Sequence, residues 1–326
     1  MQQRTLGKTE FTVGEVGLGC WQFGGDFGPM TKQTATEIMM AAVENGTTLF
    51  DTADVYGNGR SEARIGHFLA DTGQHLRIIT KFGREADVYP DKYTEQTLRQ
   101  RTEESLERLG VDCLDLTQLH CVPMPVLKDG AIFDWLRKLK DEGKIRHFGA
   151  SVESVEEAMV CLEHEDLASL QIIFNIFRQK PIAELLPQAQ AQNVAIIVRL
   201  PLASGLLAGK FTKDTTFVKT DHRNYNRDGQ YFNVGETFAG LPFEKGVELA
   251  DAIKAWVPEG MTMAQMAMRW ILDHEAVSVV IPGASSPKQV IDNAQVSDLP
   301  PLPAELHRKL AEFYQGSVHD HIRGPY

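Results

Sequence analysis

Short apolar runs alternate with amphipathic stretches along almost the whole chain. Eight such runs, each about the length of a buried β-strand, occupy residues 16–19, 48–51, 78–81, 114–120, 147–151, 170–174, 195–199 and 278–281. Between and after them, apolar residues recur every three to four positions, as in helices with one buried face, over residues 35–45, 61–69, 94–109, 132–142, 155–163, 182–192, 263–273 and 287–296. Apolar strands that alternate with helices predict a parallel sheet covered by helices. Eight units favour a (β/α)8 barrel, with an open doubly wound sheet as the alternative.

The remaining segments predict additions to this barrel. Residues 1–15 have the pattern of a β-hairpin, and residues 201–244 form a long polar loop after the seventh strand. Residues 241–256 and 304–314 predict extra helices, the second followed by a tail. The length of 326 residues would allow two domains, but no linker or low-complexity segment divides the chain. We therefore expect a single barrel domain over residues 1–326.

Composition excludes several classes of protein. The formal net charge of −11 argues against binding to nucleic acid or to an anionic membrane surface, which need clustered Lys and Arg. The four cysteines have no C-x-x-C spacing, so neither a zinc finger nor a disulfide framework is expected. The first residues lack an apolar signal-peptide core, and no apolar run has the length of a membrane span. We expect a cytoplasmic protein that binds neither nucleic acid nor membrane, and the sequence leaves its oligomeric state open.

Polar residues stand where the apolar runs end. The runs end on or beside Asp51, Lys81, His120, Ser151 and Arg199. Each has a structural explanation when taken singly: the aspartate could bond backbone amides, the lysine could reach solvent, and the histidine could be a core residue. In a barrel, however, the carboxyl ends of all strands meet at one mouth, where active sites lie. An acid, an amine and an imidazole at that mouth together predict a catalytic site.

Tyr56 follows Asp51 by five residues and supplies a possible acid–base group. A free phenol titrates near pH 10, and a neighbouring ammonium such as that of Lys81 is expected to lower this pKa. Such a tyrosine can give a proton to a carbonyl oxygen or take one from an alcohol. The set contains neither a nucleophile with its base nor two carboxylates flanking a water.

Several sequence motifs occur in order around these residues. They are RTLGKTEFTV, GLGCWQFGG, FDTADVYGNGRSE, TKFG, LTQLH, IRHFGAS, PLASGLLAGKF and IPGASSPKQVIDN. With them the chain resembles the aldo-keto reductases, NAD(P)-dependent (β/α)8 barrels, over nearly its whole length. The resemblance implies a reductase of aldehydes or ketones, reversible as an alcohol or sugar dehydrogenase, with a small carbonyl or alcohol substrate. It implies that Tyr56 is the general acid/base, that Lys81 lowers its pKa, that Asp51 positions Lys81 and that His120 orients the substrate carbonyl.

The same resemblance implies where the cofactor binds. Gly19 and Trp21 would flank the nicotinamide and the substrate, while Ser151 and Gln171 would bind the carboxamide. Val152 replaces the asparagine that is usual in the family, so one carboxamide contact is expected to be lost. The loop over residues 202–210 would close on the pyrophosphate through Leu202, Ser204, Gly205, Leu206 and Lys210. The adenosine phosphate would lie on residues 283–293, through Gly283, Ser285, Lys288, Gln289, Asp292 and Asn293.

The cofactor preference is expected to be NADP(H) over NAD(H), mainly on the family resemblance. Many members place a basic residue against the 2′-phosphate where this chain has Ser285, so Ser286, Lys288 and Gln289 are the remaining candidates for that contact. Lys288 could equally be an ordinary solvated lysine. The resemblance also implies that the C-terminal tail covers the substrate mouth, so truncation after Gly316 should alter selectivity more than stability.

Arg199 is the clearest departure from the family, because many members have an aromatic ring there that stacks on the nicotinamide. Its guanidinium could stack and disfavour the cationic oxidised ring, select an anionic substrate, or pair with an acidic loop residue such as Asp54.

Two other functions stay open. One is a cofactor-sensing regulatory protein, similar to the channel-associated beta subunits that share this barrel. The other is a metal-dependent barrel hydrolase, for which only Asp51 and His120 qualify as strand-end ligands. The His319/His321 pair lies in the tail, where we expect a mobile surface feature.

Overall fold

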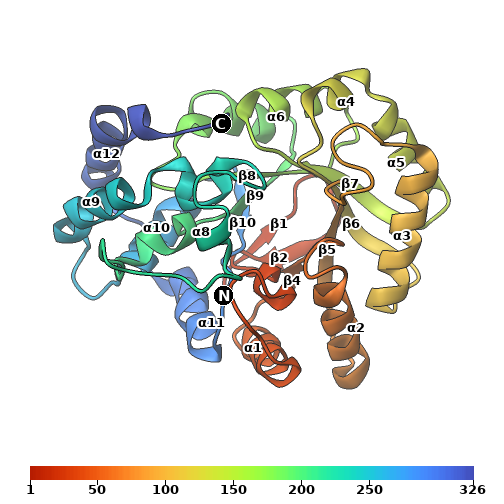
Figure 1. Ribbon diagram of the computed structural model, residues 1–326, viewed down its shortest axis with the longest axis horizontal. Coiled ribbons are helices and arrows are strands. Elements are labelled where there is room, and N and C mark those ends of the chain that lie inside the picture. The colour runs from red at the N-terminus through yellow and green to blue at the C-terminus, as the bar shows by residue number, and fades with distance from the viewer.

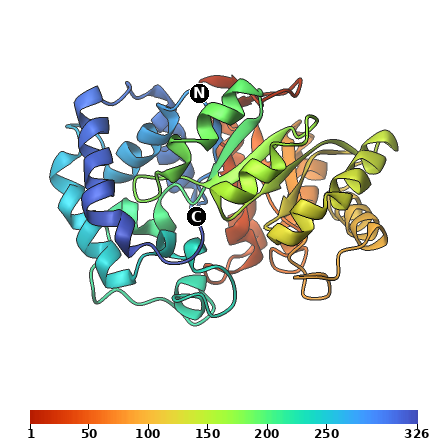
Figure 2. The ribbon, with the colours of Figure 1, turned by 90° about the horizontal axis from the view of Figure 1, so that it is seen from above.

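The computed structural model describes all 326 residues and confirms the parallel barrel. Eight strands pair in chain order, each parallel to the next, and curl into a barrel (Figures 1 and 2). Parallel bridges from Val16 to Val280 and from Gly19 to Gly283 join the first strand to the last. The strands are β3 (Leu18–Gly19), β4 (Leu49–Asp51), β5 (Arg77–Phe82), β6 (Leu114–His120), β7 (Ile145–Ser151), β8 (Ser169–Ile173), β9 (Ala195–Arg199) and β10 (Val277–Val280).

Helices cover the outside of the barrel. All eight stretches with helical periodicity form helices, although η2 (Lys180–Ile182), a 3-10 turn, begins the sixth of them. The helices that follow the strands are α1 (Lys32–Glu44), α2 (Arg60–Thr72), α3 (Glu95–Leu109), α5 (Ala131–Asp141), α6 (Val155–Cys161), α7 (Leu185–Ala191), α10 (Met263–Leu272) and α11 (Pro287–Ala294). The predicted extra helices are α9 (Phe243–Ile253) and α12 (Ala304–Phe313), whereas α4 (Met124–Asp129) and α8 (His222–Tyr225) were not predicted. None of the helices has both the length and the apolar character needed to cross a bilayer.

The N-terminal hairpin closes one end of the barrel. Strands β1 (Gln3–Thr5) and β2 (Thr12–Gly14) pair antiparallel, as the sequence predicts. Leu6, Phe11 and Val13 from this hairpin form one buried cluster with residues of the barrel strands. Burial of each such side chain contributes about 1.5–3 kcal/mol, so the hairpin seals the amino-terminal end with an apolar plug.

Inside the barrel, side chains change from apolar to polar along each strand. Alternate residues of a strand point to the same face, so Leu116, Gln118 and His120 of β6 follow one another up the interior. Leu116 belongs to the apolar cluster that the hairpin seals, as does Ile79 of β5, two residues before Lys81. The polar residues therefore gather at the carboxyl end, opposite the hairpin, where long loops surround the mouth.

Candidate active site

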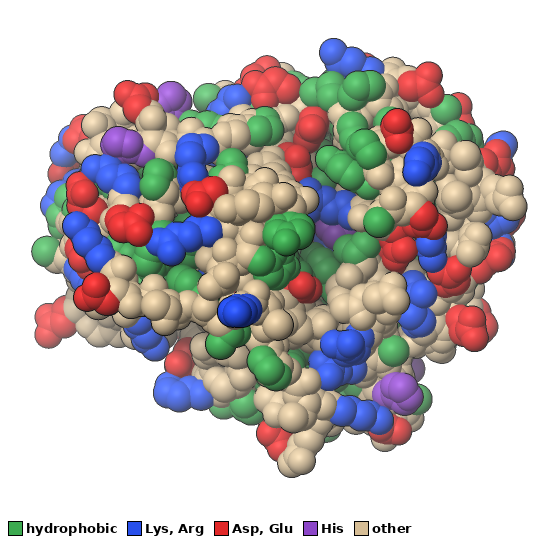
Figure 3. Space-filling model, in the orientation of Figure 1, with side chains coloured by type: hydrophobic (Ala, Val, Ile, Leu, Met, Phe, Trp, Pro, Cys, Tyr) green, Lys and Arg blue, Asp and Glu red, His purple; other side chains and the backbone are tan.

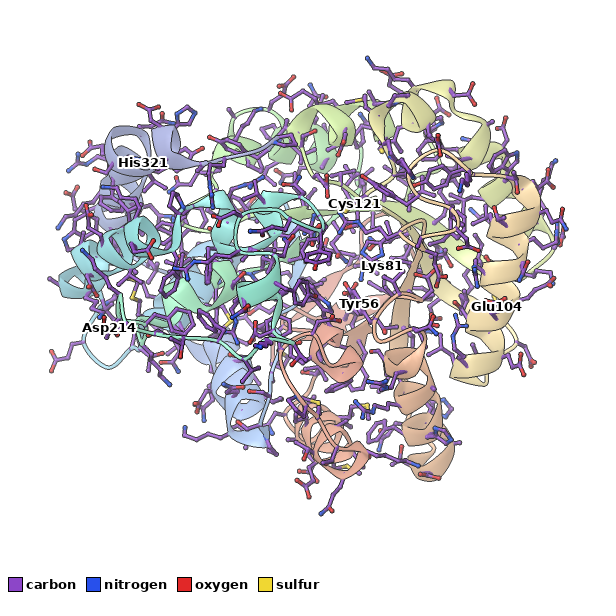
Figure 4. The ribbon with its side chains drawn as sticks, viewed as in Figure 1. Tyr56, Lys81, Glu104, Cys121, Asp214 and His321 are labelled. Atoms are coloured by element: carbon purple, nitrogen blue, oxygen red, sulfur yellow. The ribbon has the colours of Figure 1, made fainter.

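Lys81 occupies the centre of the mouth and is almost completely buried. Its Nζ donates hydrogen bonds to Asp51 Oδ2 at 2.7 Å, to the Thr52 carbonyl oxygen at 2.6 Å and to the Tyr56 hydroxyl at 3.3 Å. The strand register explains this assembly, because Asp51 pairs with Ile79 and Lys81 lies two residues further along the same face of β5. Figure 4 shows Lys81 and Tyr56 close together near the centre of the molecule. The structure thus brings together the acid, amine and phenol that the sequence singled out.

Tyr56 is held by the turns that follow β4. Its backbone packs against Gly24, where a Cβ would lie 2.7 Å from the Tyr56 carbonyl carbon, so only glycine leaves room for this approach. The Tyr56 ring stacks on Trp21 with centroids 5.9 Å apart, and meets the His120 ring edge-on at 5.8 Å. The phenol therefore has little freedom to leave Lys81.

The pKa of Tyr56 departs from its expected direction. Burial raises this pKa well above its ordinary value, and the charges of Asp51 and Glu236 raise it further, whereas Arg199 lowers it. The resemblance implied that Lys81 lowers the pKa of the phenol; in the structure, burial and the carboxylates outweigh any such effect, and the pKa is raised overall. Besides burial, the physical reason is that the Asp51 carboxylate, 2.7 Å from the ammonium, opposes the effect of that cation at the phenol. Tyr56 is accordingly a protonated phenol at neutral pH.

His120 completes the predicted group of four, from the end of β6. Burial lowers the pKa of its imidazole well below the ordinary value, and the cations Lys81, Arg84 and Arg199 lower it further. Its Nδ1 is buried without a hydrogen-bond partner in the protein. A neutral imidazole beside the phenol can donate or accept one hydrogen bond at the position of a carbonyl oxygen.

A cavity of about 320 Å³ opens beside these residues. It runs from Asp51, Tyr56 and His120 to the segment before α11, and Figure 3 shows the molecule hollowed at this face, with Lys or Arg and His side chains inside. The predicted cofactor residues that line it are Gly19, Trp21, Gln171, Arg199, Leu202, Ser204, Gly205, Lys210, Gly283, Ser285 and Gln289. Ser151, Leu206, Lys288, Asp292 and Asn293 do not line it. The cavity lining therefore connects three of the four catalytic candidates with the predicted cofactor segments.

The loop after β9 turns its backbone into an unusual shape at the cavity wall. Leu200, Ala203, Ser204 and Gly205 have φ values of 52°, 49°, 55° and 103°. Non-glycine residues avoid this left-handed region, so three of them within five positions indicate a strained backbone of the kind found at functional sites. Backbone N–H groups in such turns form concave anion sites, which fits the expected contact with pyrophosphate.

The segment at α11 agrees only in part with the expected adenosine site. Gln289 Oε1 accepts hydrogen bonds from the Ser285 backbone N–H at 2.7 Å and from its hydroxyl at 3.0 Å, beside the cavity. Lys288 instead pairs with Asp292 at 2.8 Å on the exposed side of the helix. Neither residue faces the cavity, and Asn293 is largely buried elsewhere. The contacts predicted for these three residues are therefore not preformed.

Comparisons with known proteins agree with the family that the sequence motifs indicated. A sequence model described as the aldo/keto reductase family matches residues 15–315. The chain belongs to this family. It is 30% identical to the aldo-keto reductase YhdN of Bacillus subtilis over 89% of this chain and 87% of that protein. It is 27% identical to the NADH-specific methylglyoxal reductase of Escherichia coli, over 96% of this chain and 99% of that protein.

The barrel also matches solved structures of this family. The glycerol dehydrogenase AKR11B4 from Gluconobacter oxydans superposes with a TM-score of 0.78 at 28% identity, covering 99% of this chain and 97% of that one. Family membership and the shared barrel establish this aldo-keto reductase as an oxidoreductase.

Two residues of the long loop after β9 also line the cavity and were missed in the sequence. Arg223, just inside α8, forms a bidentate ion pair with Asp221 and lies over the Phe217 ring at 4.5 Å. Glu236 reaches back to the mouth, 3.0 Å from Arg84 Nη1 and 3.5 Å from Arg199 Nη1. The only sequence signal for Arg223 is the aromatic and basic character of residues 211–227, and no local pattern indicates Glu236.

Arg199 is therefore paired, but not with Asp54. Its Nη2 also donates to the Val152 carbonyl oxygen at 3.0 Å, so the guanidinium crosses the mouth from β9 toward the end of β7. Asp54 is buried elsewhere, and burial together with Glu62 and Glu85 raises its pKa well above the ordinary value. Asp54 therefore does not pair with Arg199, and Glu236 supplies the carboxylate instead.

An arginine–carboxylate cluster surrounds Cys121 and consists of Arg84, Glu153, Glu236 and Arg199. The Cys121 sulfur and the two carboxylates have atoms within 4.8 Å of one another, a grouping that could suit a metal. However, Arg84 already pairs with both glutamates, and burial raises the pKa of the Cys121 thiol to about 12. Thiols bind metals as thiolates, so this set is better suited to balancing charge than to holding a cation.

The C-terminal tail packs beside the long loop rather than over the cavity. Val318 is fully buried, and Arg323 donates to the Gly240 carbonyl oxygen at 2.9 Å and to Asp228 at 2.7 Å. No tail residue lines the cavity, and Figure 4 shows His321 far from the centre, beside α12. The expectation that the tail covers the substrate mouth is therefore not met, and these contacts favour a role in stability.

Proposed function

We propose that this aldo-keto reductase reduces aldehydes or ketones with NAD(P)H, and oxidises the corresponding alcohols or sugars in reverse, with Tyr56 as general acid/base. The observation that carries the proposal is the position of Lys81 Nζ, 2.7 Å from Asp51 Oδ2 and 3.3 Å from the Tyr56 hydroxyl. A buried cation fixed at the oxygen of a phenol stabilises the charge that develops when the proton leaves.

The proton and the hydride have separate sources. Bound nicotinamide supplies the hydride, while Tyr56 gives its proton to the carbonyl oxygen. The raised pKa of Tyr56 keeps that proton in place until the oxygen of the substrate gains negative charge. His120, neutral because burial lowers its pKa, orients the same oxygen through a hydrogen bond. In the oxidative direction the same atoms accept the proton from the alcohol.

The residues along the cavity fit a dinucleotide. Gln171 and the end of β9 meet the cavity beside Tyr56, the left-handed turn at Ala203–Gly205 suits the pyrophosphate, and Lys210 adds positive charge. Gly19 and Gly283 both line the cavity, and a Cβ at Gly283 would overlap the Gln22 amide at 1.9 Å, so only glycine allows this close packing of the wall. We propose NADP(H) as the preferred cofactor, supported by Lys210 and Arg223, two of the three cations that line the cavity.

The test is a turnover screen of short aldehydes, dicarbonyls and aldoses, with NADPH and NADH compared side by side. We expect oxidation of the reduced cofactor that depends on the carbonyl compound, and a lower KM for NADPH. Tight binding of either cofactor without turnover of any carbonyl would instead favour a cofactor-sensing role. A lower KM for NADH would overturn the cofactor preference alone.

A further inference from the structure

Five polar side chains form a continuous hydrogen-bonded chain inside the barrel. Gln118 Nε2 donates to Ser169 Oγ at 2.9 Å, and Gln171 Nε2 donates to both Gln118 Oε1 at 2.9 Å and Asp51 Oδ1 at 2.7 Å. The other oxygen of Asp51 accepts from Lys81. All five are buried, the most accessible being Asp51 with 3% of its surface exposed. The carboxylate that holds the catalytic lysine therefore also holds Gln171.

The direction of every bond follows from the Asp51–Lys81 ion pair. A carboxylate only accepts, so Gln171 must turn its amide nitrogen toward Asp51. The second N–H of the same nitrogen then needs an acceptor, which Gln118 supplies through its oxygen. Gln118 must in turn direct its nitrogen at the Ser169 hydroxyl. With both N–H groups of Gln171 used inside the barrel, its amide oxygen is the atom left to accept a hydrogen bond from a ligand in the cavity that Gln171 lines.

The backbone leaves space for these hydrogen-bonded side chains at one glycine. Gln118 on β6 is paired with Gly149 on β7, and Gly149 is paired with Ser169 on β8. The Gln118–Ser169 bond therefore crosses β7 at a residue without a side chain. A Cβ on Gly149 would lie 2.1 Å from Ser169 Oγ and would block the crossing.

We propose that Gln118 is a positioning residue for cofactor recognition, which acts through Gln171 by fixing the amide oxygen as a hydrogen-bond acceptor for the nicotinamide carboxamide. The inference rests on the proposed function, because it presumes a bound nicotinamide. A carboxamide held by its N–H presents one face of the ring to the substrate. Without the acceptor that Gln118 provides, one N–H of Gln171 is unpaired, and the amide gains freedom to turn.

The decisive variant is Gln118→Met, which keeps the length of the side chain and removes both of its polar ends. Calorimetric titration should show about tenfold weaker binding of NADPH, the effect of one lost hydrogen bond to a well-placed partner. Binding of 2′-phospho-ADP-ribose, which lacks the nicotinamide, should change less than about twofold by the same reasoning. Turnover with NADPH deuterated on one or the other ring face should show loss of facial selectivity.

A matched control lies on the same strand. Thr117→Val changes the buried neighbour of Gln118 that points to the opposite face of β6, and its hydroxyl has no partner to lose. We expect this control to match the wild type in both binding measurements and in facial selectivity. Equal weakening of NADPH and of the nicotinamide-free fragment in Gln118→Met, with facial selectivity intact, would show a purely structural role and overturn the proposal.

A milder variant covers the case in which Gln118→Met does not fold. Ser169→Ala removes only the hydroxyl that Gln118 donates to, so NADPH binding should weaken by about two- to fivefold, and the fragment should bind as before. A Ser169→Ala protein identical to the control in all three measurements overturns the proposal. Failure of the wild type to bind either NADPH or NADH would overturn the proposed function itself, which separates the two results.

Discussion

Two clusters of polar and charged residues share the mouth of this barrel, and they are assembled in different ways. The tetrad cluster (Asp51, Tyr56, Lys81 and His120) comes from the ends of three neighbouring strands and one turn, within 70 residues of sequence. The arginine–carboxylate cluster depends on Glu236, a residue from the long loop after β9 that returns across the mouth. Strand ends place the first cluster, whereas the course of a loop places the second. We therefore expect changes in the first to affect chemistry and folding most, and changes in the second to tune charge.

Removal of the Tyr56 hydroxyl is expected to have the largest effect. Tyr56→Phe keeps the ring against Trp21 but removes the proton donor, so kcat should fall by roughly 10²- to 10⁴-fold. The dissociation constant for NADPH should barely change, because the ring and the cavity stay in place. Steady-state kinetics and fluorescence titration of the cofactor measure the two quantities. A variant with the turnover of the wild type would end the assignment of Tyr56 as acid/base.

The pH profile of the wild type provides the matching control. Because burial and Asp51 raise the pKa of Tyr56, the rate of carbonyl reduction should stay level through neutral pH to the ordinary phenol range near 10. A loss of reduction between pH 7 and about 9 would mean that the cation of Lys81 outweighs burial at the phenol after all.

Lys81→Met should produce the largest loss of stability. The variant leaves the buried carboxylate of Asp51 without its cation, and breaking a buried ion pair in this way costs about 3–5 kcal/mol. Denaturant titration measures the free energy of unfolding. The same measurement on Lys81→Met/Asp51→Leu should recover part of the loss, because both charges are then absent. No recovery would mean that packing of the lysine stem, rather than its charge, stabilises the mouth.

The sequence predicted the first cluster because its members stand at fixed places relative to apolar strands. Asp51, Lys81 and His120 each end such a strand, and parallel strands end at a common mouth. Gln118 was missed, although the same argument applies to it. It lies two residues before His120 on β6 and points to the same interior of the barrel. Glu236 could not be found in this way. Its contacts with Arg84 and Arg199 depend on the course of the loop over residues 201–244, for which no periodic pattern exists.

Glu236→Gln tests whether the second cluster is mainly a charge balance. The amide can still accept a hydrogen bond, so the expected loss of stability is about 1–3 kcal/mol, below that of Lys81→Met. Although burial opposes it, the cations of Arg84 and Arg199 lower the pKa of Glu236 below its ordinary value. Its contribution should therefore be complete above the unfolded pKa and disappear as the pH falls through the lower folded pKa.

Unfolding measured across acidic pH decides this point. The difference in stability between the wild type and Glu236→Gln should shrink as the pH drops below about 4.5, where the unfolded glutamate takes up its proton. A difference that stays constant across that range would show that the carboxylate contributes by shape and hydrogen bonding alone.

The smallest expected effect concerns Arg199 and the charge of the cofactor. The oxidised nicotinamide is cationic and the reduced ring is neutral, so an unpaired guanidinium nearby would disfavour only the oxidised form. A tenfold preference corresponds to about 1.4 kcal/mol, but Glu236 lies 3.5 Å from Arg199 and cancels much of that field.

Arg199→Met in the wild-type background should therefore change the ratio of the NADP⁺ and NADPH dissociation constants by less than about threefold. In a Glu236→Gln background the same substitution should change that ratio by about tenfold, since the compensating carboxylate is absent. Equal changes in the two backgrounds would mean that Glu236 does not screen Arg199. No change in either would mean that the guanidinium acts only through its bonds to Val152 and Glu236, as a brace across the mouth.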